Sequence, residues 1–235
     1  MTVPHPRDVD VLACDYDRTL TDLDLNLRRE TLDALHAARE RGLTVLAVSG
    51  RDADFLARAL GDAVDLIVAE NGAFLVDPAT GHEEPLFTDW PGVERLKALG
   101  VPMEYATASA SAHIEYEDAL TRAVRQAGLN VDLARNIDRI MLLPAGVEKA
   151  AGFAAALKRL GVPRERAAAA GDGENDLSLL GAAGYRIAVA NAVPDVRAIA
   201  HHVTRAPGGE GVREWLTEVW APARAQPPRG VARRG

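Results

Sequence analysis

Three short apolar runs, far apart in the chain, each end in a cluster of polar groups. The runs and their clusters are Val9–Cys14 before Asp15-Tyr16-Asp17-Arg18-Thr19, Leu43–Val48 before Ser49-Gly50-Arg51, and Ala167–Ala170 before Gly171-Asp172-Gly173-Glu174-Asn175-Asp176. Short apolar runs of this kind are typical of buried strands in a parallel sheet. Because an open α/β sheet binds ligands at the carboxyl ends of its strands, we expect the three clusters to meet there.

The rest of the chain alternates helix and strand signals. Apolar residues at helical spacing run from Leu27 to Arg41, and Leu66–Ala69 and Ala73–Val76 form a predicted β-hairpin. Further predicted elements are a helix over 149–160, a strand over 185–190, a helix after Pro194, a strand over 202–204 and a helix over 212–219. Strand-helix-strand order predicts right-handed crossovers. The predicted fold class is therefore α/β, with a doubly wound, mainly parallel sheet formed by residues 1–84 and 146–220.

Residues 85–145 have a different pattern, which predicts a compact α+β cap domain inserted into the chain. Its predicted elements are a helix over 93–99, a strand over 103–107, a helix over 113–127, and strands over 131–133 and 137–143. After the insert the alternation resumes. The last segment, 221–235, is rich in proline and arginine and is predicted to be disordered.

Asp15 and Asp17 can face one pocket, since side chains two apart on an extended chain share a side. Two carboxylates so close repel each other unless a cation lies between them or one holds a proton. Asp15 could then attack phosphorus as a nucleophile, while Asp17 acts as the acid and base. An isolated pair of this kind more often caps a loop, but the other two clusters weaken that alternative.

The remaining polar groups also fit a phosphate and a metal. Ser49 and the backbone freed by Gly50 can hold a phosphate at the start of a helix, although serine there is more often only an N-cap. Lys149 opens a predicted helix just before the acidic cluster, whereas most lysines are solvated surface groups. The cluster at 171–176 is rich in the oxygen ligands that Mg²⁺ prefers. A calcium loop is the competing interpretation, but the spacing lacks its alternating ligands and closing glutamate.

In order and context, these motifs resemble the four motifs of the haloacid dehalogenase (HAD) superfamily. The long insert, the Ala-Glu-Asn-Gly-Ala run at 69–73 and Ala190-Asn191-Ala192 look like the Cof-type (IIB) branch, whose core is Rossmann-like. The resemblance covers nearly the whole chain apart from the last fifteen residues or so. Arg18 departs from the pattern, because this branch usually has glycine there. A cation beside the pocket could change the choice of substrate.

The resemblance implies a role for each matching residue. Asp15 would be the nucleophile that forms an aspartyl-phosphate, and Asp17 the acid and base. Mg²⁺ would be the cofactor, held by the Asp15 carboxylate, the Asp17 main-chain carbonyl and Asp172. The residues that would hold the phosphoryl group are Thr19, Ser49, Gly50 and Lys149. Those that would order Lys149 and the metal-bound waters are Asn175 and Asp176. Possible substrate contacts are Arg51, Asn71, Arg135, Asn136, Arg139 and Asn191.

The expected partner is a small phosphorylated metabolite. The short cap and total length look most like archaeal-type phosphoglycolate phosphatases, which makes 2-phosphoglycolate the best single guess. Sugar-phosphate phosphatases of the same branch are close alternatives, and a phosphomutase ranks lower. A non-catalytic phosphometabolite-binding protein would be signalled by loss of Asp15, Asp17 or Asp172, and all three are present.

Composition excludes several other classes of protein. The formal net charge of −7 argues against a polyanionic partner such as nucleic acid. No apolar stretch is long enough to span a bilayer, and the first residues lack a secretory segment, so we expect no membrane contact and a cytoplasmic location. Cys14 is the only cysteine, so no intrachain disulfide can form. A monomer or a homodimer is expected.

Overall fold

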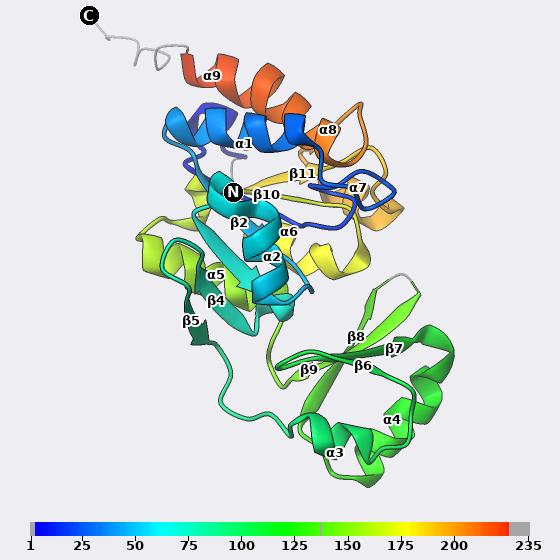
Figure 1. Cartoon of the computed structure of the whole chain (residues 1–235). Helices are drawn as coiled ribbons and strands as arrows, with labels where there is room; N and C mark the ends of the chain where they lie inside the picture. Colours follow the sequence, from blue (N-terminus) through cyan, green and yellow to red (C-terminus); the bar gives the residue numbers. More distant parts are fainter. Residues whose placement is uncertain (1–2, 137, 226–235) are drawn as a thin grey trace, which may run out of the picture.

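The computed structural model describes residues 3–136 and 138–225, and its strands form two separate sheets (Figure 1). The large sheet has the order β12-β11-β10-β1-β2-β3-β4-β5, and the small sheet the order β6-β7-β9-β8. The strands of the large sheet are β1 (Val11–Cys14), β2 (Thr44–Val48), β3 (Leu66–Ala69), β4 (Phe74–Asp77), β5 (His82–Pro85), β10 (Ala167–Gly171), β11 (Tyr185–Ala188) and β12 (His202–Val203). Those of the small sheet are β6 (Glu104–Tyr105), β7 (Ala110–His113), β8 (Val131–Asn136) and β9 (Arg139–Pro144).

The large sheet confirms the predicted α/β class. Strands β12 to β3 pair in parallel, whereas β4 pairs antiparallel with β3, and β5 pairs antiparallel with β4 at the edge. β1 lies in the middle, with β2 on one side and β10 on the other. The chain therefore adds strands in opposite directions from β1, so the polar clusters after β1, β2 and β10 meet at one edge of the sheet.

Helices cover both faces of the large sheet, because successive side chains of each strand point to opposite faces. Leu12 packs in the same cluster as Leu35 of α1, whereas Ala13 packs with Phe153 of α5. The helices of the first cluster are α1 (Arg29–Glu40), α2 (Ala53–Leu60) and α8 (Gly208–Glu214), followed by a π-helical turn (Trp215–Trp220) and α9 (Ala221–Ala225). Those of the second are α5 (Lys149–Leu160), α6 (Leu177–Ala182) and α7 (Pro194–Ile199). Short 3-10 turns lie at Pro6–Asp8, Gly61–Ala63, Glu70–Gly72, Ile114–Tyr116, Arg164–Arg166 and Glu174–Asp176.

The small sheet has its own core. Helices α3 (Val93–Lys97) and α4 (Glu117–Gln126) pack on one of its faces through a cluster that includes Leu96, Leu120 and Leu142. The opposite face is turned toward the carboxyl-end edge of the large sheet (Figure 1). β7 was not predicted, because its residues are alanine, serine and histidine, which have little β propensity. The predicted strand over 137–143 begins at Ile137, which lies outside the described residues, and β9 begins at Arg139.

Two other segments differ from the sequence predictions. The exposed edge strand β5 was not predicted, and through it Pro85 pairs with Phe74, so the large sheet includes the first residue assigned to the insert. The predicted disordered tail begins instead as helix α9, because Trp220 and Arg224 anchor this segment to the start of the chain. The Trp220 Nε1 donates to the Val9 carbonyl at 3.1 Å, and Arg224 Nη1 lies 3.0 Å from Asp10 Oδ1. Residues 226–235 of that predicted tail lie outside the described residues.

No helix among the described residues is both long enough and apolar enough to cross a membrane.

Candidate active site

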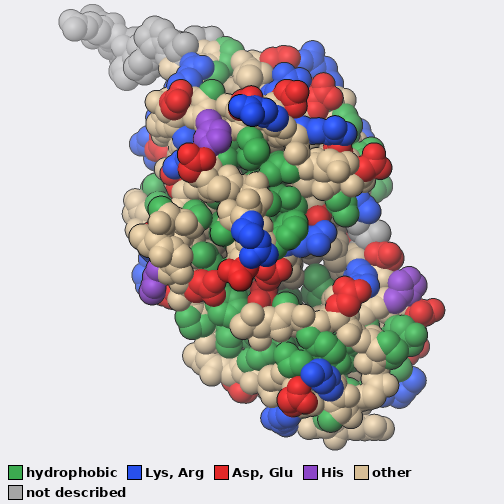
Figure 2. Space-filling view, viewed as in Figure 1, with side chains coloured by type: hydrophobic (Ala, Val, Ile, Leu, Met, Phe, Trp, Pro, Cys, Tyr) green, Lys and Arg blue, Asp and Glu red, His purple; other side chains and the backbone are tan. Residues whose placement is uncertain are grey.

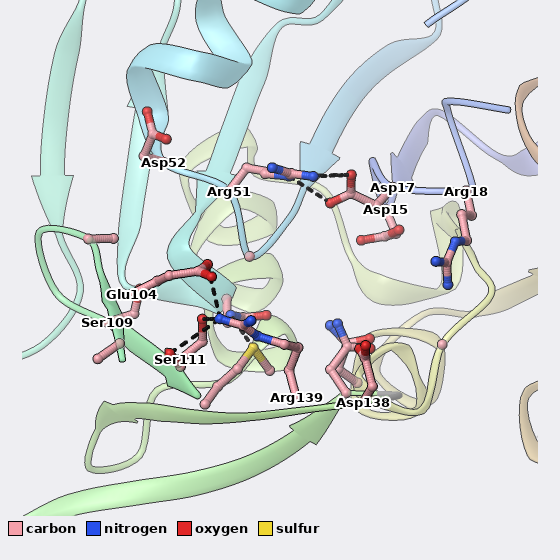
Figure 3. Close-up of a pocket in the computed structure, with 18 of the residues that line it drawn as sticks. Asp15, Asp17, Arg18, Arg51, Asp52, Glu104, Ser109, Ser111, Asp138 and Arg139 are labelled. Carbon is pink, nitrogen blue, oxygen red and sulfur yellow. Dashed lines mark hydrogen bonds and ion pairs between the residues drawn. The ribbon is translucent and has the colours of Figure 1, made fainter. Parts of the chain in front are cut away.

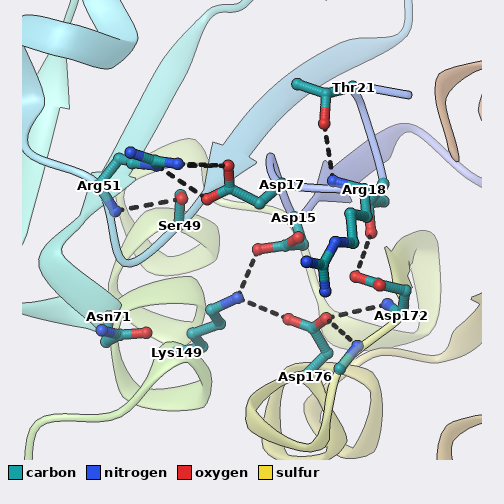
Figure 4. A network of polar contacts seen from close by, with 12 residues as sticks. Asp15, Asp17, Arg18, Thr21, Ser49, Arg51, Asn71, Lys149, Asp172 and Asp176 are labelled. Atoms are coloured by element: carbon teal, nitrogen blue, oxygen red, sulfur yellow. Dashed lines mark hydrogen bonds and ion pairs between the residues drawn. The ribbon is translucent and has the colours of Figure 1, made fainter. Parts of the chain in front are cut away.

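Lys149 joins the clusters that follow β1 and β10. Its ammonium Nζ donates to Asp15 Oδ1 and to Asp176 Oδ1, each at 2.6 Å, and only 2% of the residue is exposed (Figure 4). Lys149 is the first residue of α5, Asp15 directly follows β1, and Asp176 lies in the turn after β10. The predicted meeting of these groups at one edge of the sheet is therefore present in the structure.

Burial and charge act against each other in this network. Burial and the nearby Asp176 raise the pKa of Asp15 well above its usual range, although Lys149 opposes the change. Burial alone would lower the pKa of Lys149, but Asp15 and Asp176 outweigh it, so the pKa of Lys149 is raised and its ammonium stays charged. Burial and Asp176 also raise the pKa of Asp172 to about 6. One buried cation among three carboxylates leaves an excess of negative charge that a metal ion would offset.

The donor atoms present fit a hard divalent cation. Carboxylate oxygens of Asp15, Asp172 and Asp176 lie within 4.8 Å of one another. Asp176 is already engaged, because its Oδ2 accepts the backbone N–H groups of Asp172 and Gly173 at 3.0 Å and its Oδ1 accepts from Lys149. Asp15 and Asp172 keep lone pairs for a metal such as Mg²⁺.

Asp17 is held by an arginine. Arg51 Nε and Nη2 each donate to a different oxygen of Asp17 at 2.9 Å (Figure 4), and the guanidinium lies 5.2 Å from the centre of the Phe55 ring. The hydroxyl of Ser49 accepts the Arg51 backbone N–H at 3.2 Å. The Asp17 carboxylate is thus tied to the loop after β2.

Asp172 is positioned by two residues for which the sequence predicted other roles. The Thr19 hydroxyl donates to Asp172 Oδ1 at 3.1 Å, although Thr19 was predicted to hold the phosphoryl group. Asn191 Nδ2 lies 3.1 Å from Asp172 Oδ2 and 3.1 Å from the Arg18 carbonyl, although Asn191 was predicted to contact the substrate. Both side chains therefore hold the Asp172 carboxylate in place through hydrogen bonds.

A cavity of about 470 Å³ separates this edge from the small sheet (Figure 3), and the space-filling view is hollowed between the two regions (Figure 2). The predicted site residues that line it are Asp15, Asp17, Gly50, Arg51, Asn71, Asn136, Arg139, Asp172 and Asn175. Those that lie outside its wall are Thr19, Ser49, Arg135, Lys149, Asp176 and Asn191.

Arg135 does not reach the cavity. Its Nη2 lies 2.7 Å from Glu117 on α4, and 69% of its side chain is exposed. The next residue on β8, Asn136, points to the opposite face, as adjacent residues of a strand must, and lines the cavity together with Arg139, its partner across the sheet. The structure therefore separates two residues that the sequence grouped together.

The small sheet contributes residues that the sequence did not single out. Arg139 Nη2 donates to the Ser111 hydroxyl at 2.7 Å and lies 2.9 Å from Glu104 Oε2 (Figure 3). Asp138 also lines the cavity. Strand alternation could have pointed to Ser111 only if β7 had been recognised, because its neighbours Ala110 and Ala112 face the core of the insert.

Glu70 connects the large sheet to the insert. Its carboxylate is buried and accepts the backbone N–H groups of Thr107 and Ala108, at 3.1 and 2.8 Å, and the Ser109 hydroxyl at 2.8 Å. The adjacent Asn71 N–H donates to the Ser49 carbonyl at 2.8 Å. The turn at 70–72 therefore fixes the loop before β7 relative to the loop after β2, a role that the sequence pattern did not reveal.

This geometry agrees with comparisons with known proteins. The model of the haloacid dehalogenase-like hydrolase family matches residues 12–88 and 114–216. A phosphoglycolate phosphatase of Methanothermobacter thermautotrophicus is 31% identical over 217 residues, 86% of this chain and 95% of the relative. One from Pyrobaculum neutrophilum is 32% identical over 216 residues, 87% of this chain and 92% of the relative.

Solved structures share the fold. A haloacid dehalogenase-like hydrolase from Bacteroides thetaiotaomicron has a TM-score of 0.76 at 20% identity, covering 88% of this chain and 98% of its own. A sugar phosphatase of HAD subclass IIB has a TM-score of 0.72 at 21% identity, with 88% and 98% covered. The family match includes strands β8 and β9 of the small sheet and all the residues of the acidic cluster. The chain belongs to the haloacid dehalogenase-like hydrolase family.

Proposed function

We propose that the protein is a Mg²⁺-dependent phosphatase that hydrolyses a small phosphomonoester, 2-phosphoglycolate, through an aspartyl-phosphate on Asp15. The observation that carries this proposal is the position of Asp15, which lines the cavity while its Oδ1 is held by the buried Lys149. A carboxylate fixed in this way at the wall of a cavity can attack phosphorus without reorganising its surroundings.

The reaction then has two steps. In the first, an oxygen of Asp15 forms a bond to phosphorus while the bond to the ester oxygen breaks, and Asp17 gives a proton to the departing alkoxide. In the second, Asp17 takes a proton from water, the hydroxide attacks the phosphorus of the aspartyl-phosphate, and inorganic phosphate leaves with Asp15 restored. Lys149 and donors around Ser49 stabilise the negative charge that spreads over the phosphoryl oxygens.

The metal would be held by Asp15, Asp172 and the main-chain carbonyl of Asp17. Bound there, Mg²⁺ would offset the negative charge of the phosphoryl oxygens as a Lewis acid. Arg51 adds a condition for turnover, because its guanidinium occupies both carboxylate oxygens of Asp17 in this structure. Substrate binding has to shift Arg51 before an Asp17 oxygen can reach the ester oxygen.

The choice of 2-phosphoglycolate is supported by the relatives that share about a third of their residues with this chain and carry that activity in their names. The sugar phosphatase shares the fold at 21% identity. We also propose a cytoplasmic location, which cell fractionation tests. The proposed oligomeric state is a monomer or a homodimer, which light scattering tests.

The proposal is tested by release of inorganic phosphate from 2-phosphoglycolate, glucose 6-phosphate and p-nitrophenyl phosphate, each with Mg²⁺ and with excess chelator. We expect the highest kcat/KM for 2-phosphoglycolate and little release in chelator. A higher kcat/KM for glucose 6-phosphate would show that the substrate is a sugar phosphate. Full activity in excess chelator would show that the reaction does not need a metal. Folded protein that releases no phosphate from any ester would be a binding protein instead.

A further inference from the structure

The three arginines that line the cavity are not equivalent. Arg51 is paired with Asp17 and Arg139 with Glu104, each at 2.9 Å. Within residues 3–136 and 138–225, the guanidinium of Arg18 makes neither a hydrogen bond nor an ion pair. It points from the large-sheet side into the cavity (Figures 3 and 4). Arg18 is thus a cation on the cavity wall whose donors remain available.

The backbone conformation at Arg18 is strained for any residue with a side chain. Its φ is 59°, in the left-handed region, which costs an L-residue about 1–2 kcal/mol and glycine almost nothing. This conformation is held by the Arg18 N–H, which donates to the Thr21 hydroxyl at 2.7 Å, and by Asn191, which donates to the Arg18 carbonyl at 3.1 Å. Glycine would serve the fold at least as well, so a role for the guanidinium must account for arginine here.

The phosphoryl group has its own cation in Lys149, which lies behind Asp15 and outside the cavity wall. Arg18 stands within the cavity, where the rest of the substrate has to lie. A guanidinium with free donors matches a carboxylate in a two-pronged hydrogen bond. We propose that Arg18 binds the carboxylate of the substrate's leaving group, so that the enzyme prefers phosphomonoesters of small hydroxy acids to those of neutral alcohols.

This proposal rests on the proposed function and specifies its substrate class. Two variants test it, Arg18→Gly, which suits the backbone, and Arg18→Lys, which keeps the charge without the two-pronged geometry. The substrates are 2-phosphoglycolate and 2-hydroxyethyl phosphate, which differ in the carboxylate. We expect Arg18→Gly to lower kcat/KM about 10- to 100-fold for 2-phosphoglycolate, the loss of a charged hydrogen bond, and about twofold or less for the neutral ester. For Arg18→Lys, kcat/KM for 2-phosphoglycolate should lie between the values for Arg18→Gly and wild type.

Thermal unfolding and a matched variant serve as controls. Arg18→Gly should not lower the unfolding midpoint, because glycine relieves the left-handed strain. Arg125→Ala removes an exposed arginine on α4. Its kcat/KM for each of the two substrates should stay within about twofold of the wild-type value. Equal losses of kcat/KM on the two substrates would place Arg18 at the phosphoryl group and overturn the proposal. A kcat/KM for 2-phosphoglycolate that is unchanged in Arg18→Gly would overturn the proposal as well.

Binding measurements separate this inference from the proposed function. Calorimetry with Mg²⁺ compares 3-phosphonopropionate, a non-hydrolysable analogue of 2-phosphoglycolate, with the neutral 3-hydroxypropylphosphonate. Wild type should bind the carboxylated analogue about tenfold or more tightly than the neutral one, and Arg18→Gly should abolish that preference. If wild type hydrolyses neither ester, the proposed function fails, yet the analogues still test Arg18. A preference that survives in Arg18→Gly would refute its role.

Discussion

The two sides of the cavity are built in different ways. On the large-sheet side, the side chains of Lys149 and Asp176 are each 1% exposed and are locked by hydrogen bonds to one another and to the backbone. On the small-sheet side, the side chains of Arg139 and Glu104 are 31% and 79% exposed, and their ion pair can be broken at little cost. The groups proposed to carry out the chemistry are therefore fixed by the fold, whereas those proposed to select the substrate can rearrange around it.

The largest expected effect is at the nucleophile. Asp15→Asn keeps the shape of the side chain but removes the attacking charge, so kcat should fall roughly 10⁴-fold or more on every ester, including p-nitrophenyl phosphate. Circular dichroism checks that the variant is folded, and rapid quench should find a phosphorylated Asp15 only in the wild type. Substantial turnover by folded Asp15→Asn would contradict the assignment.

Lys149→Met should affect both stability and catalysis. It removes the cation between Asp15 and Asp176 and leaves two buried carboxylates unpaired, which should cost about 3–5 kcal/mol in the free energy of unfolding. The loss of its ammonium from the phosphoryl site should also lower kcat by roughly 10²–10³-fold. Urea unfolding and steady-state kinetics measure the two effects. A variant as stable as wild type would mean that the fold does not depend on this network.

Asp172→Ala tests the metal site with a readout that does not need turnover. Mg²⁺ that binds only the folded protein should raise the unfolding midpoint of the wild type, and this rise should be lost in the variant. The Mg²⁺ concentration that gives half-maximal activity should increase about tenfold or more, because one of the two available carboxylates is gone. An equal Mg²⁺-induced stabilisation of both proteins would place the metal elsewhere.

On the small-sheet side, Arg139→Ala should act on selected substrates only. The change frees Glu104, whose charge then repels the carboxylate of the leaving group, so kcat/KM for 2-phosphoglycolate should fall about tenfold while that for p-nitrophenyl phosphate, which has no carboxylate, changes little. Arg135→Ala is the matched variant, because Arg135 lies on the same sheet but points away from the cavity. Its kcat/KM for both substrates should stay within about twofold of the wild-type value. Equal losses on both substrates in Arg139→Ala would show that the insert also orders the catalytic groups.

The smallest effect is expected where the two regions are joined. Glu70→Gln keeps the shape but weakens three hydrogen bonds to residues 107–109, so the insert should hold its position less firmly. We expect kcat/KM for 2-phosphoglycolate to fall about threefold to tenfold, with p-nitrophenyl phosphate less affected. Hydrogen exchange at the Thr107 and Ala108 amides should become faster. Unchanged exchange would mean that other contacts hold this loop.

The large-sheet side could be predicted closely from the sequence, because its groups follow strands in a recognisable order. Even Ala167–Ala170, a poor strand by propensity, was predicted because it is an apolar run that ends in a polar cluster. The small-sheet side could not be predicted as well, since the face that Arg135 or Asn136 occupies depends on where β8 begins and on its pairing with β9. The ion pairs of Arg51 and Arg139 and the contacts of Glu70 join segments distant in the chain, which no local pattern specifies.

The order of strands also bears on how the protein folds during synthesis. All four strands of the small sheet lie between residues 104 and 144, whereas Val11 of β1 pairs with Ala167 of β10. We expect the small sheet to be completed while β1, the strand before Asp15, still has one unpaired edge. Such an edge invites pairing with other chains. Slower elongation after residue 144 should therefore increase aggregation of the nascent protein, and a chaperone that covers apolar surface should reduce it.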